Sequence, residues 1–284
     1  MSWLVWVWDR ATIGDDTRGI MPNNRRFVHP DGCHQERGVA AVSSQQLYRV
    51  RLAWGAEGVR WLAPSSDVVV IVDVLSFSTA VDVAVGRGAT VLPWRWREAS
   101  AVDQARTTGA ALAVNRRDLS PSTPYSLSPA SLGDIPAGTR LLLPSPNGAT
   151  LATIAAESGA IVLTGCLRNA TAVGLTALRL GRRVTVVAAG EHWPDGTGWR
   201  PALEDELGAG SILDAIGSDP SPEAWLASAA FRAAGAQVAT LIADGESGRE
   251  LRDDGFGRDV ELATEVDVSQ AVPRMIDGEF VDDR

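Results

Sequence analysis

Three acidic residues occur where the chain could bring carboxylates together. Asp73 directly follows residues 68–72, five consecutive β-branched side chains that predict a strand buried on both faces of a sheet. Ligands of open α/β sheets bind beyond the carboxyl ends of the strands, so Asp73 is the first candidate for chemistry. Glu204 and Asp205 stand in the first turn of a later predicted helix, which we expect to begin at the same edge of the sheet. Asp73, Glu204 and Asp205 are therefore candidate ligands of Mg²⁺, and the alternative is that the helix acids only complement the helix dipole.

Polar and glycine-containing turns follow other predicted strands and lead into helices. The free N–H groups and the dipole at a helix N-terminus attract an anion. Arg168 and Arg200 could hold a doubly charged anion through forked hydrogen bonds, or pair with surface acids instead. The candidate anion-binding residues are Ser76, Ser78, Thr79, Ser145, Asn147, Gly148, Arg168, Asn169 and Arg200. Each could equally be an ordinary cap or turn residue, and the convergence of several turns is what favours a binding site.

Two further residues could act as an acid, a base or a nucleophile. Glu191, beside His192, could exchange a proton with a substrate, or it could belong to a solvated loop. Cys166 lies between a predicted strand and a helix, where a thiolate can be stabilised. The sequence contains no lysine, and no arginine follows Cys166 at the spacing of cysteine phosphatases, so we interpret Cys166 as structural. The absence of lysine also excludes Schiff-base chemistry and a Walker-type phosphate-binding loop.

The composition is that of an acidic globular protein. The 284 residues carry a formal net charge of −9, and 45% of them are apolar, enough for a large core. The acidic balance and the lack of an arginine run argue against a nucleic-acid partner. Two cysteines are too few for a disulfide framework, no apolar run reaches the length of a membrane span, and the first residues lack the features of a signal peptide. We expect a cytoplasmic protein without a membrane partner, and homo-oligomerisation is left open.

Hydrophobic periodicity predicts a single α/β domain over residues 41–284. Strands are predicted at 48–52, 68–74, 89–92, 111–114, 140–143, 160–164 and 184–188, and helices at 53–62, 79–86, 97–108, 149–156, 170–180, 203–216 and 223–234. This repeated order indicates a three-layer α/β/α fold with a mostly parallel central sheet. Residues 119–136 are interpreted as a surface excursion, and the tail after residue 248 is hard to place. Residues 1–40 lack periodicity and predict a disordered N-terminal extension.

Taken in order, the motifs resemble the 2-phosphosulfolactate phosphatase (ComB) family. The resemblance rests on Asp73-Val-Leu, Ser145-Pro-Asn-Gly148, Gly165-Cys-Leu-Arg-Asn169, Gly190-Glu191 and Leu203-Glu204-Asp205, and extends from about residue 48 to residue 273. It implies Mg²⁺-dependent hydrolysis of a phosphate ester that also carries a carboxylate and a sulfonate. It further implies Asp73, Glu204 and Asp205 as the acidic positions, and Asn147, Gly148 and Asn169 as the anion-binding turns. One departure is Ser76, which stands where many members have arginine.

These expectations combine into one hypothesis, a Mg²⁺-dependent phosphomonoesterase that acts on a small, anionic, phosphorylated metabolite. Asp73 with Glu204 or Asp205 would hold the metal, and Glu191 would exchange a proton. Either a water molecule or Asp73 itself could attack the phosphorus. The alternatives are a family member that binds anions without catalysis and, less favoured, a hydrolase that depends on Cys166.

Overall fold

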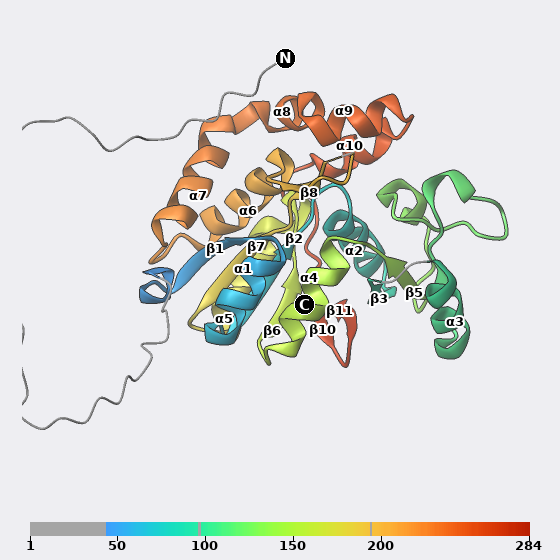
Figure 1. The fold of residues 1–284 in the computed structure, drawn as a ribbon, viewed down its shortest axis with the longest axis horizontal. Coiled ribbons are helices and arrows are strands. Elements are labelled where there is room, and N and C mark those ends of the chain that lie inside the picture. The colour runs from blue at the N-terminus through green and yellow to red at the C-terminus, as the bar shows by residue number, and fades with distance from the viewer. Residues whose placement is uncertain (1–43, 96–97, 194) are drawn as a thin grey trace, which may run out of the picture. The chain divides into compact units, whose positions relative to one another are not determined.

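The central sheet of this computed structural model consists of two parallel blocks joined by an antiparallel hairpin. The structure describes residues 44–95, 98–193 and 195–284. The first block is β1 (Val50–Trp54), β7 (Val184–Ala188), β2 (Val68–Val72) and β6 (Ile161–Thr164), and the second is β3 (Thr90–Trp94), β5 (Arg140–Pro144) and β4 (Ala111–Leu112). Between them lies the hairpin of β10 (Pro273–Ile276) and β11 (Glu279–Asp282), with β10 antiparallel to β6 and β11 antiparallel to β3 (Figure 1). The predicted α/β class with a mostly parallel sheet is confirmed.

Helices cover both faces of the sheet because β2 buries side chains on both. Val68, Val70 and Val72 belong to one hydrophobic core, and Val69 and Ile71 belong to another. The first core includes residues of α5 (Ala170–Leu180), α6 (Leu203–Ile216), α7 (Pro222–Ala234), α8 (Val238–Asp244) and α10 (Gly257–Ala263), and the second includes residues of α1 (Gly55–Leu62), α2 (Phe77–Gly86) and α4 (Gly148–Glu157). Alternation along one fully buried strand therefore fixes the three layers.

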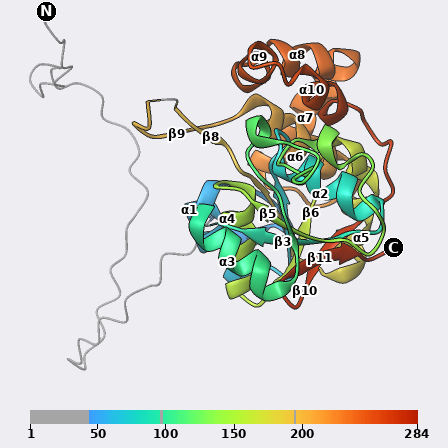
Figure 2. The ribbon, with the colours of Figure 1, turned by 90° about the vertical axis from the view of Figure 1, so that its right-hand side faces the viewer.

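The remaining elements lie around this framework. α3 (Glu98–Thr108) packs against β4 and β5, and α9 (Glu246–Asp253) packs beside α8 and α10 (Figure 2). A separate ribbon of β8 (Glu191–His192) and β9 (Trp199–Arg200) follows β7 and pairs Glu191 with Arg200. The 3₁₀ turns are η1 (Ser44–Leu47), η2 (Ala63–Ser65), η3 (Arg116–Asp118), η4 (Pro129–Leu132), η5 (Leu167–Asn169) and η6 (Gly235–Gln237).

Two regions differ from the sequence-based interpretation. The tail that lacked a clear pattern supplies β10 and β11, which lie inside the sheet rather than outside it. The segment interpreted as a surface excursion, 119–136, is also corrected, because Leu132 is fully buried and Ile135 almost so in the core under α2. Both errors have one cause, since few apolar side chains at irregular spacing carry no periodicity that a sequence pattern could reveal.

The predicted N-terminal extension, residues 1–40, lies outside the described residues.

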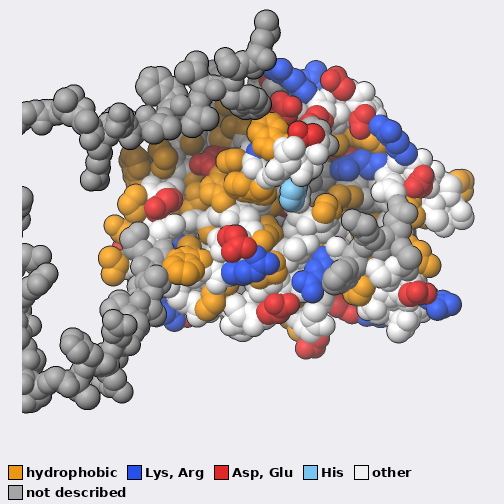
Figure 3. All heavy atoms as spheres, in the orientation of Figure 1, with side chains coloured by type: hydrophobic (Ala, Val, Ile, Leu, Met, Phe, Trp, Pro, Cys, Tyr) orange, Lys and Arg blue, Asp and Glu red, His pale blue; other side chains and the backbone are white. Residues whose placement is uncertain are grey.

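Among the described residues, the helical segment Pro222–Asp244 is long and apolar enough to cross a membrane by length and composition. Our sequence-based count of apolar runs missed it. Only 22% of its apolar window is buried, on the side where α7 packs along α6. Acidic and basic side chains are intermixed over the face shown in Figure 3, with hydrophobic side chains between them.

Candidate active site

Four carboxylates meet near the carboxyl end of β2. Asp73 follows β2, Glu191 follows β7, and Glu204 and Asp205 stand in the first turn of α6. Asp73, Glu204 and Asp205 are at least 95% buried, and each lies close enough to another acid of the group to raise its pKa. The structure therefore brings together the four residues that the sequence predicted as catalytic acids.

Backbone N–H groups hold two of these carboxylates in place. Asp73 Oδ2 accepts a hydrogen bond from Gly148 N at 2.8 Å, and Asp73 Oδ1 accepts one from Phe77 N at 3.3 Å. Asp205 Oδ1 accepts from Val74 N at 2.7 Å, and Asp205 Oδ2 accepts from Gly190 N at 2.8 Å. Asp205 thus joins the loop after β2 to the loop after β7, and both loops become parts of one rigid site.

Gly148 has to be glycine for the turn after β5 to approach Asp73. A Cβ at this position would lie 2.3 Å from the Phe77 ring and 2.8 Å from Asp73 Oδ2, both shorter than van der Waals contact. Although β5 belongs to the second parallel block, this close approach brings its terminal turn to the acid that follows β2. The Gly148 N–H, predicted to bind an anion, binds the Asp73 carboxylate.

Burial and mutual repulsion raise the pKa values of the acids. Burial, followed by the charge of Glu191, raises the pKa of Asp73 to about 7, although its two N–H donors oppose the shift. Burial, followed by Asp73 and Glu204, holds the pKa of Asp205 well above its usual range. Burial also raises the pKa of Glu204, against the opposing hydrogen bond from Ser247 and the charge of Arg200. A group of desolvated carboxylates of this kind is destabilised when ionised and is relieved by a cation.

The donor set fits a metal that needs few protein ligands. The described residues contain no group of three or more His, Cys, Asp or Glu side chains arranged to hold a metal ion by themselves. Mg²⁺ is usually bound by one or two carboxylates, several waters and substrate phosphate oxygens. Each carboxylate oxygen has about two lone pairs, so Asp73 keeps acceptor capacity beyond its two backbone bonds. The carboxylates therefore fit Mg²⁺ held jointly with a phosphate, and do not fit a closed structural metal site.

Arg200 supplies a buried positive charge with an unused donor. Its side chain is 7% exposed, its Nη2 donates to Ser247 Oγ at 3.1 Å, and its guanidinium lies 5.5 Å from the centre of the Trp193 ring. Its Nε is buried and has no hydrogen-bond partner among the described residues. Because a buried donor without a partner is costly, Arg200 is a candidate to bind an acceptor that a ligand brings.

Asn147 and Glu191 are connected to each other. Asn147 Nδ2 donates to Glu191 Oε1 at 3.0 Å, and the same oxygen accepts from His192 N at 2.7 Å. Asn147 immediately precedes the glycine that contacts Asp73, so this pair lies beside the buried acids. His192 is exposed.

Other predicted ligand residues have partners within the protein. Arg168 Nε donates to Asp82 at 2.8 Å, and its Nη1 pairs with Glu265. Asn169 accepts from Cys166 N at 2.9 Å and donates to the Ala271 carbonyl at 3.1 Å. Ser78 and Thr79 are fully buried; Ser78 Oγ accepts from Asp73 N at 2.9 Å, and Thr79 Oγ1 donates to the Val74 carbonyl at 2.8 Å. These contacts are those of turn and cap residues, and anion binding by the four side chains stays a prediction.

The chain is similar to known proteins over most of its length. The family model described as 2-phosphosulpholactate phosphatase matches residues 61–278, about three quarters of the chain. The chain belongs to this family. A relative from Deinococcus radiodurans, named "Probable 2-phosphosulfolactate phosphatase", is 27% identical over 222 residues, which cover 76% of this chain and 90% of the relative. Membership of the 2-phosphosulfolactate phosphatase family makes the protein a phosphoric monoester hydrolase, and all the predicted site residues lie inside the matched region.

One residue missed by sequence analysis lies next to the position where this chain departs from the family resemblance. Ser76 Oγ accepts a hydrogen bond from Arg116 Nη2 at 2.6 Å, so a guanidinium is present at Ser76 although the residue itself carries none. Arg116 comes from η3, 40 residues further along the chain. The only sequence signal was the missing cation at Ser76, which does not say which of the arginines replaces it.

Cys166 has the surroundings of a structural residue of this phosphatase. Its side chain is fully buried, and burial raises the pKa of the thiol to about 12. The nucleophile in cysteine chemistry is the thiolate, which would hardly form here at neutral pH.

Replacing Cys166 by alanine should leave the phosphatase activity within about twofold of the wild type, because the thiol does not ionise. The loss of one buried sulfur should lower the free energy of unfolding by about 1–2 kcal/mol. Phosphate release and chemical denaturation measure the two effects. A tenfold loss of activity in a variant that keeps its stability would restore the cysteine hydrolase alternative.

Proposed function

We propose that this chain is a Mg²⁺-dependent phosphomonoesterase that releases phosphate from a small acidic metabolite resembling 2-phosphosulfolactate. Family membership and the printed name of the Deinococcus relative support the substrate class. The observation that carries the proposal is the group of buried carboxylates around Asp73, which are costly to ionise without a cation. A site that is unfavourable in the empty protein and favourable with metal and phosphate is what such an enzyme requires.

In this proposal Asp73, Glu204 and Asp205 form the metal-binding acids. Asp73 and Glu204 offer oxygens to the ion directly, and Asp205 holds the loops after β2 and β7 through Val74 and Gly190 while adding negative charge. When bound, Mg²⁺ would neutralise phosphoryl oxygens and lower the pKa of a water molecule. We assign the attack to water rather than to Asp73, because two backbone N–H groups already stabilise the Asp73 carboxylate.

The remaining residues would bind the phosphate ester and protonate its leaving group. Arg200 would donate its unused Nε hydrogen bond to the phosphate or to a second acid group, and the start of α4 at Asn147 would face the same anion. Glu191, oriented by Asn147, is placed to give a proton to the leaving alkoxide. The cytoplasmic location and the absence of nucleic-acid and membrane partners remain part of the proposal and rest on composition.

Phosphate release from 2-phosphosulfolactate and from phosphate esters of other hydroxy acids, with Mg²⁺ or with a chelator, tests this function. We expect release to require the metal and to leave no phosphorylated enzyme after acid quenching. Tight binding of these esters without any release would indicate an anion-binding protein, and a trapped phospho-aspartate would transfer the nucleophile role to Asp73.

Replacing Arg200 by lysine should raise KM for the phosphate ester about 10–100-fold, since a charge-assisted hydrogen bond contributes about 1.5–3 kcal/mol. Lysine keeps the positive charge near Glu204 but lacks the planar fork and the Nε donor. Steady-state kinetics measure the effect. The exposed Arg249 on α9 provides the matched control, because Arg249→Lys makes the same change outside the site. An unchanged KM in Arg200→Lys would remove Arg200 from the binding site.

A further inference from the structure

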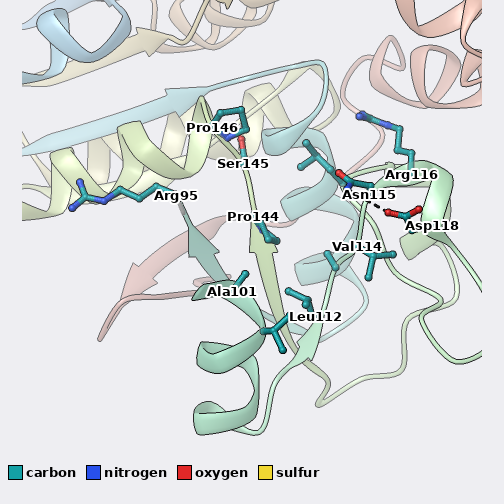
Figure 4. Close-up of a pocket in the computed structure, with 13 residues that line it drawn as sticks. Arg95, Ala101, Leu112, Val114, Asn115, Arg116, Asp118, Pro144, Ser145 and Pro146 are labelled. Carbon is teal, nitrogen blue, oxygen red and sulfur yellow. Dashed lines mark hydrogen bonds between the residues drawn. The ribbon is translucent and has the colours of Figure 1, made fainter. Parts of the chain in front are cut away.

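A cavity of about 480 Å³ lies between α3 and the ends of β4 and β5. Its walls are mostly apolar and include Ala101, Val102, Leu112, Val114, Leu127 and Pro144. Five polar side chains also line it, those of Arg95, Asn115, Arg116, Asp118 and Ser145. Figure 4 shows Ser145 and Arg116 on the far side of the cavity from Ala101 and Leu112. Cavities of this size hold small-molecule ligands, and an apolar wall with a few polar groups is their usual lining.

Two loops connect this cavity to the buried acids. The turn after β5 contributes Ser145 to the cavity and, three residues later, the Gly148 N–H to Asp73. The loop after β2 carries Asp73 at one end and, at Ser76, contacts the Arg116 guanidinium. The cavity and the acids are therefore linked through two short segments of the chain.

Arg116 is held in position yet keeps donor capacity. Its Nε donates to Asp259 Oδ2 at 3.2 Å, and its guanidinium lies 5.5 Å from the centre of the Phe256 ring. Asp259 is fixed in turn, because its other oxygen accepts bonds from Ser128 Oγ and Ala130 N. The Arg116 side chain is 20% exposed, so a group in the cavity can reach it. A guanidinium has five N–H donors, and the bonds to Asp259 and Ser76 occupy only two of them.

We propose that a substrate whose phosphate lies at the acids extends its organic part into this cavity, which makes it a phosphate ester of a hydroxy acid with an apolar substituent in place of the sulfonate-bearing group of 2-phosphosulfolactate. The inference rests on the proposed phosphatase function and specifies its substrate class. The carboxylate of the hydroxy acid binds Arg116, the ester phosphate lies at Asp73, and the substituent packs against Leu112 and Val114. A substrate with a small or strongly hydrated substituent leaves the apolar wall uncovered and gains nothing from it.

The first test compares phosphate esters of 2-hydroxy acids that differ only in the substituent, from phosphoglycolate and phospholactate to 2-phosphooxyhexanoate and phosphophenyllactate. Each buried methylene group is expected to raise kcat/KM about fourfold, from the transfer free energy of a CH₂ group. Val102 is 54% exposed and lines the cavity, so Val102→Trp fills it without burying a new side chain in the core. That variant should abolish the preference for the longer substituents, and its thermal unfolding curve serves as the folding control.

The second test measures discrimination between an acid-bearing ester and p-nitrophenyl phosphate, which has no carboxylate. Arg116→Gln should lower the ratio of the two kcat/KM values at least 30-fold, and Arg116→Lys should restore part of it. Arg117→Gln is the matched control, because Arg117 is its exposed neighbour and pairs with Asp254 on the surface. If Arg116 had a purely structural role, Arg116→Gln would lower kcat/KM for both substrates by the same factor and leave their ratio unchanged.

The outcomes separate the two proposals. If no phosphate ester is hydrolysed in a metal-dependent way, the proposed function fails. If esters are hydrolysed, but with equal kcat/KM for all substituents and an unchanged ratio in Arg116→Gln, the function stands and the cavity proposal is overturned. A preference for longer substituents that survives Val102→Trp would also overturn it, because the substituent would then bind elsewhere.

Discussion

Asp73→Asn should abolish metal-dependent phosphate release and at the same time make the metal-free protein more stable. Loss of one of the carboxylates that hold the metal should lower kcat/KM about a thousandfold or more, because metal-ion catalysis contributes several kcal/mol to transition-state stabilisation. The stability change has the opposite sign, since asparagine carries no charge to bury. The shift of the Asp73 pKa from 3.8 to about 7 corresponds to about 4 kcal/mol at pH 8. The asparagine NH₂ group would face one of the two backbone N–H donors and offset about 1–3 kcal/mol of it, so we expect a net gain of about 1–3 kcal/mol.

Kinetics with Mg²⁺ and denaturation at pH 8 with a chelator measure the two effects in the same variant. Asp103→Asn is the control, because the Asp103 side chain lies exposed on α3 and pairs with Arg106. It should change neither quantity appreciably. Wild-type turnover in Asp73→Asn would contradict the mechanism, and a less stable variant would contradict the electrostatic account of the site.

Without metal, the protein should lose stability as the pH rises from about 4 to about 7. The folded-state pKa of Asp73 lies above the unfolded value, so in this range the folded state binds more protons than the unfolded state. Protonation of Asp73 contributes its full stabilisation of the folded state below about pH 4, and this contribution is lost as the pH rises through about 7. The raised pKa values of Glu204 and Asp205 act in the same direction.

Mg²⁺ should reverse this loss at pH 8. A metal concentration of 100 times the dissociation constant stabilises the folded state by about 2.7 kcal/mol, which raises Tm by about 5–10 °C in a protein of this size. Thermal unfolding over a pH series, with and without metal, measures both effects. Subtraction of the Asp73→Asn curve isolates the contribution of Asp73 from other titrating groups. Identical Tm values with and without Mg²⁺ at pH 8 would exclude a metal bound among these acids.

In the proposed mechanism, the four carboxylates serve function at a cost to the stability of the folded protein. Asp73, Glu204 and Asp205 are buried and Glu191 is partly exposed, and the mutual repulsion of these carboxylates when ionised lowers the stability of the folded protein. The backbone N–H groups that bind Asp73 and Asp205 reduce this cost but do not remove it. The bound metal and phosphate supply the remaining compensation in the proposal.

Local pattern in the sequence was sufficient to predict much of the fold. The five β-branched residues of β2 can be satisfied only by apolar cover on two faces, which predicted the central strand and the layers around it. Local hydrophobic pattern also placed Asp73 at the end of a strand and the acids of α6 at the start of a helix. These features depend on neighbours in the chain, and for that reason a sequence reveals them.

Long-range contacts could not be predicted in this way. The hairpin of β10 and β11 enters the sheet through single pairings, Arg274 with Leu163 and Phe280 with Val91, between segments far apart in the chain. The role of each arginine depends on equally distant partners. Arg168 donates a hydrogen bond to Asp82, whereas Arg116 donates one to Ser76. Nothing in the local sequence of either arginine distinguishes an internal ion pair from a ligand-binding position.

The sequence alone determined the α/β class, the family and the set of acids, because buried strands, helix starts and turn residues each have a local chemical signature. The tertiary structure decided which polar groups remain available: Asp205 joins two loops, Gly148 binds Asp73, Arg200 keeps an unused donor, and Arg116 stands at Ser76. The physical reason is that burial and hydrogen-bond pairing are properties of three-dimensional neighbours. Those neighbours set the pKa values, the rigidity and the binding capacity of the site.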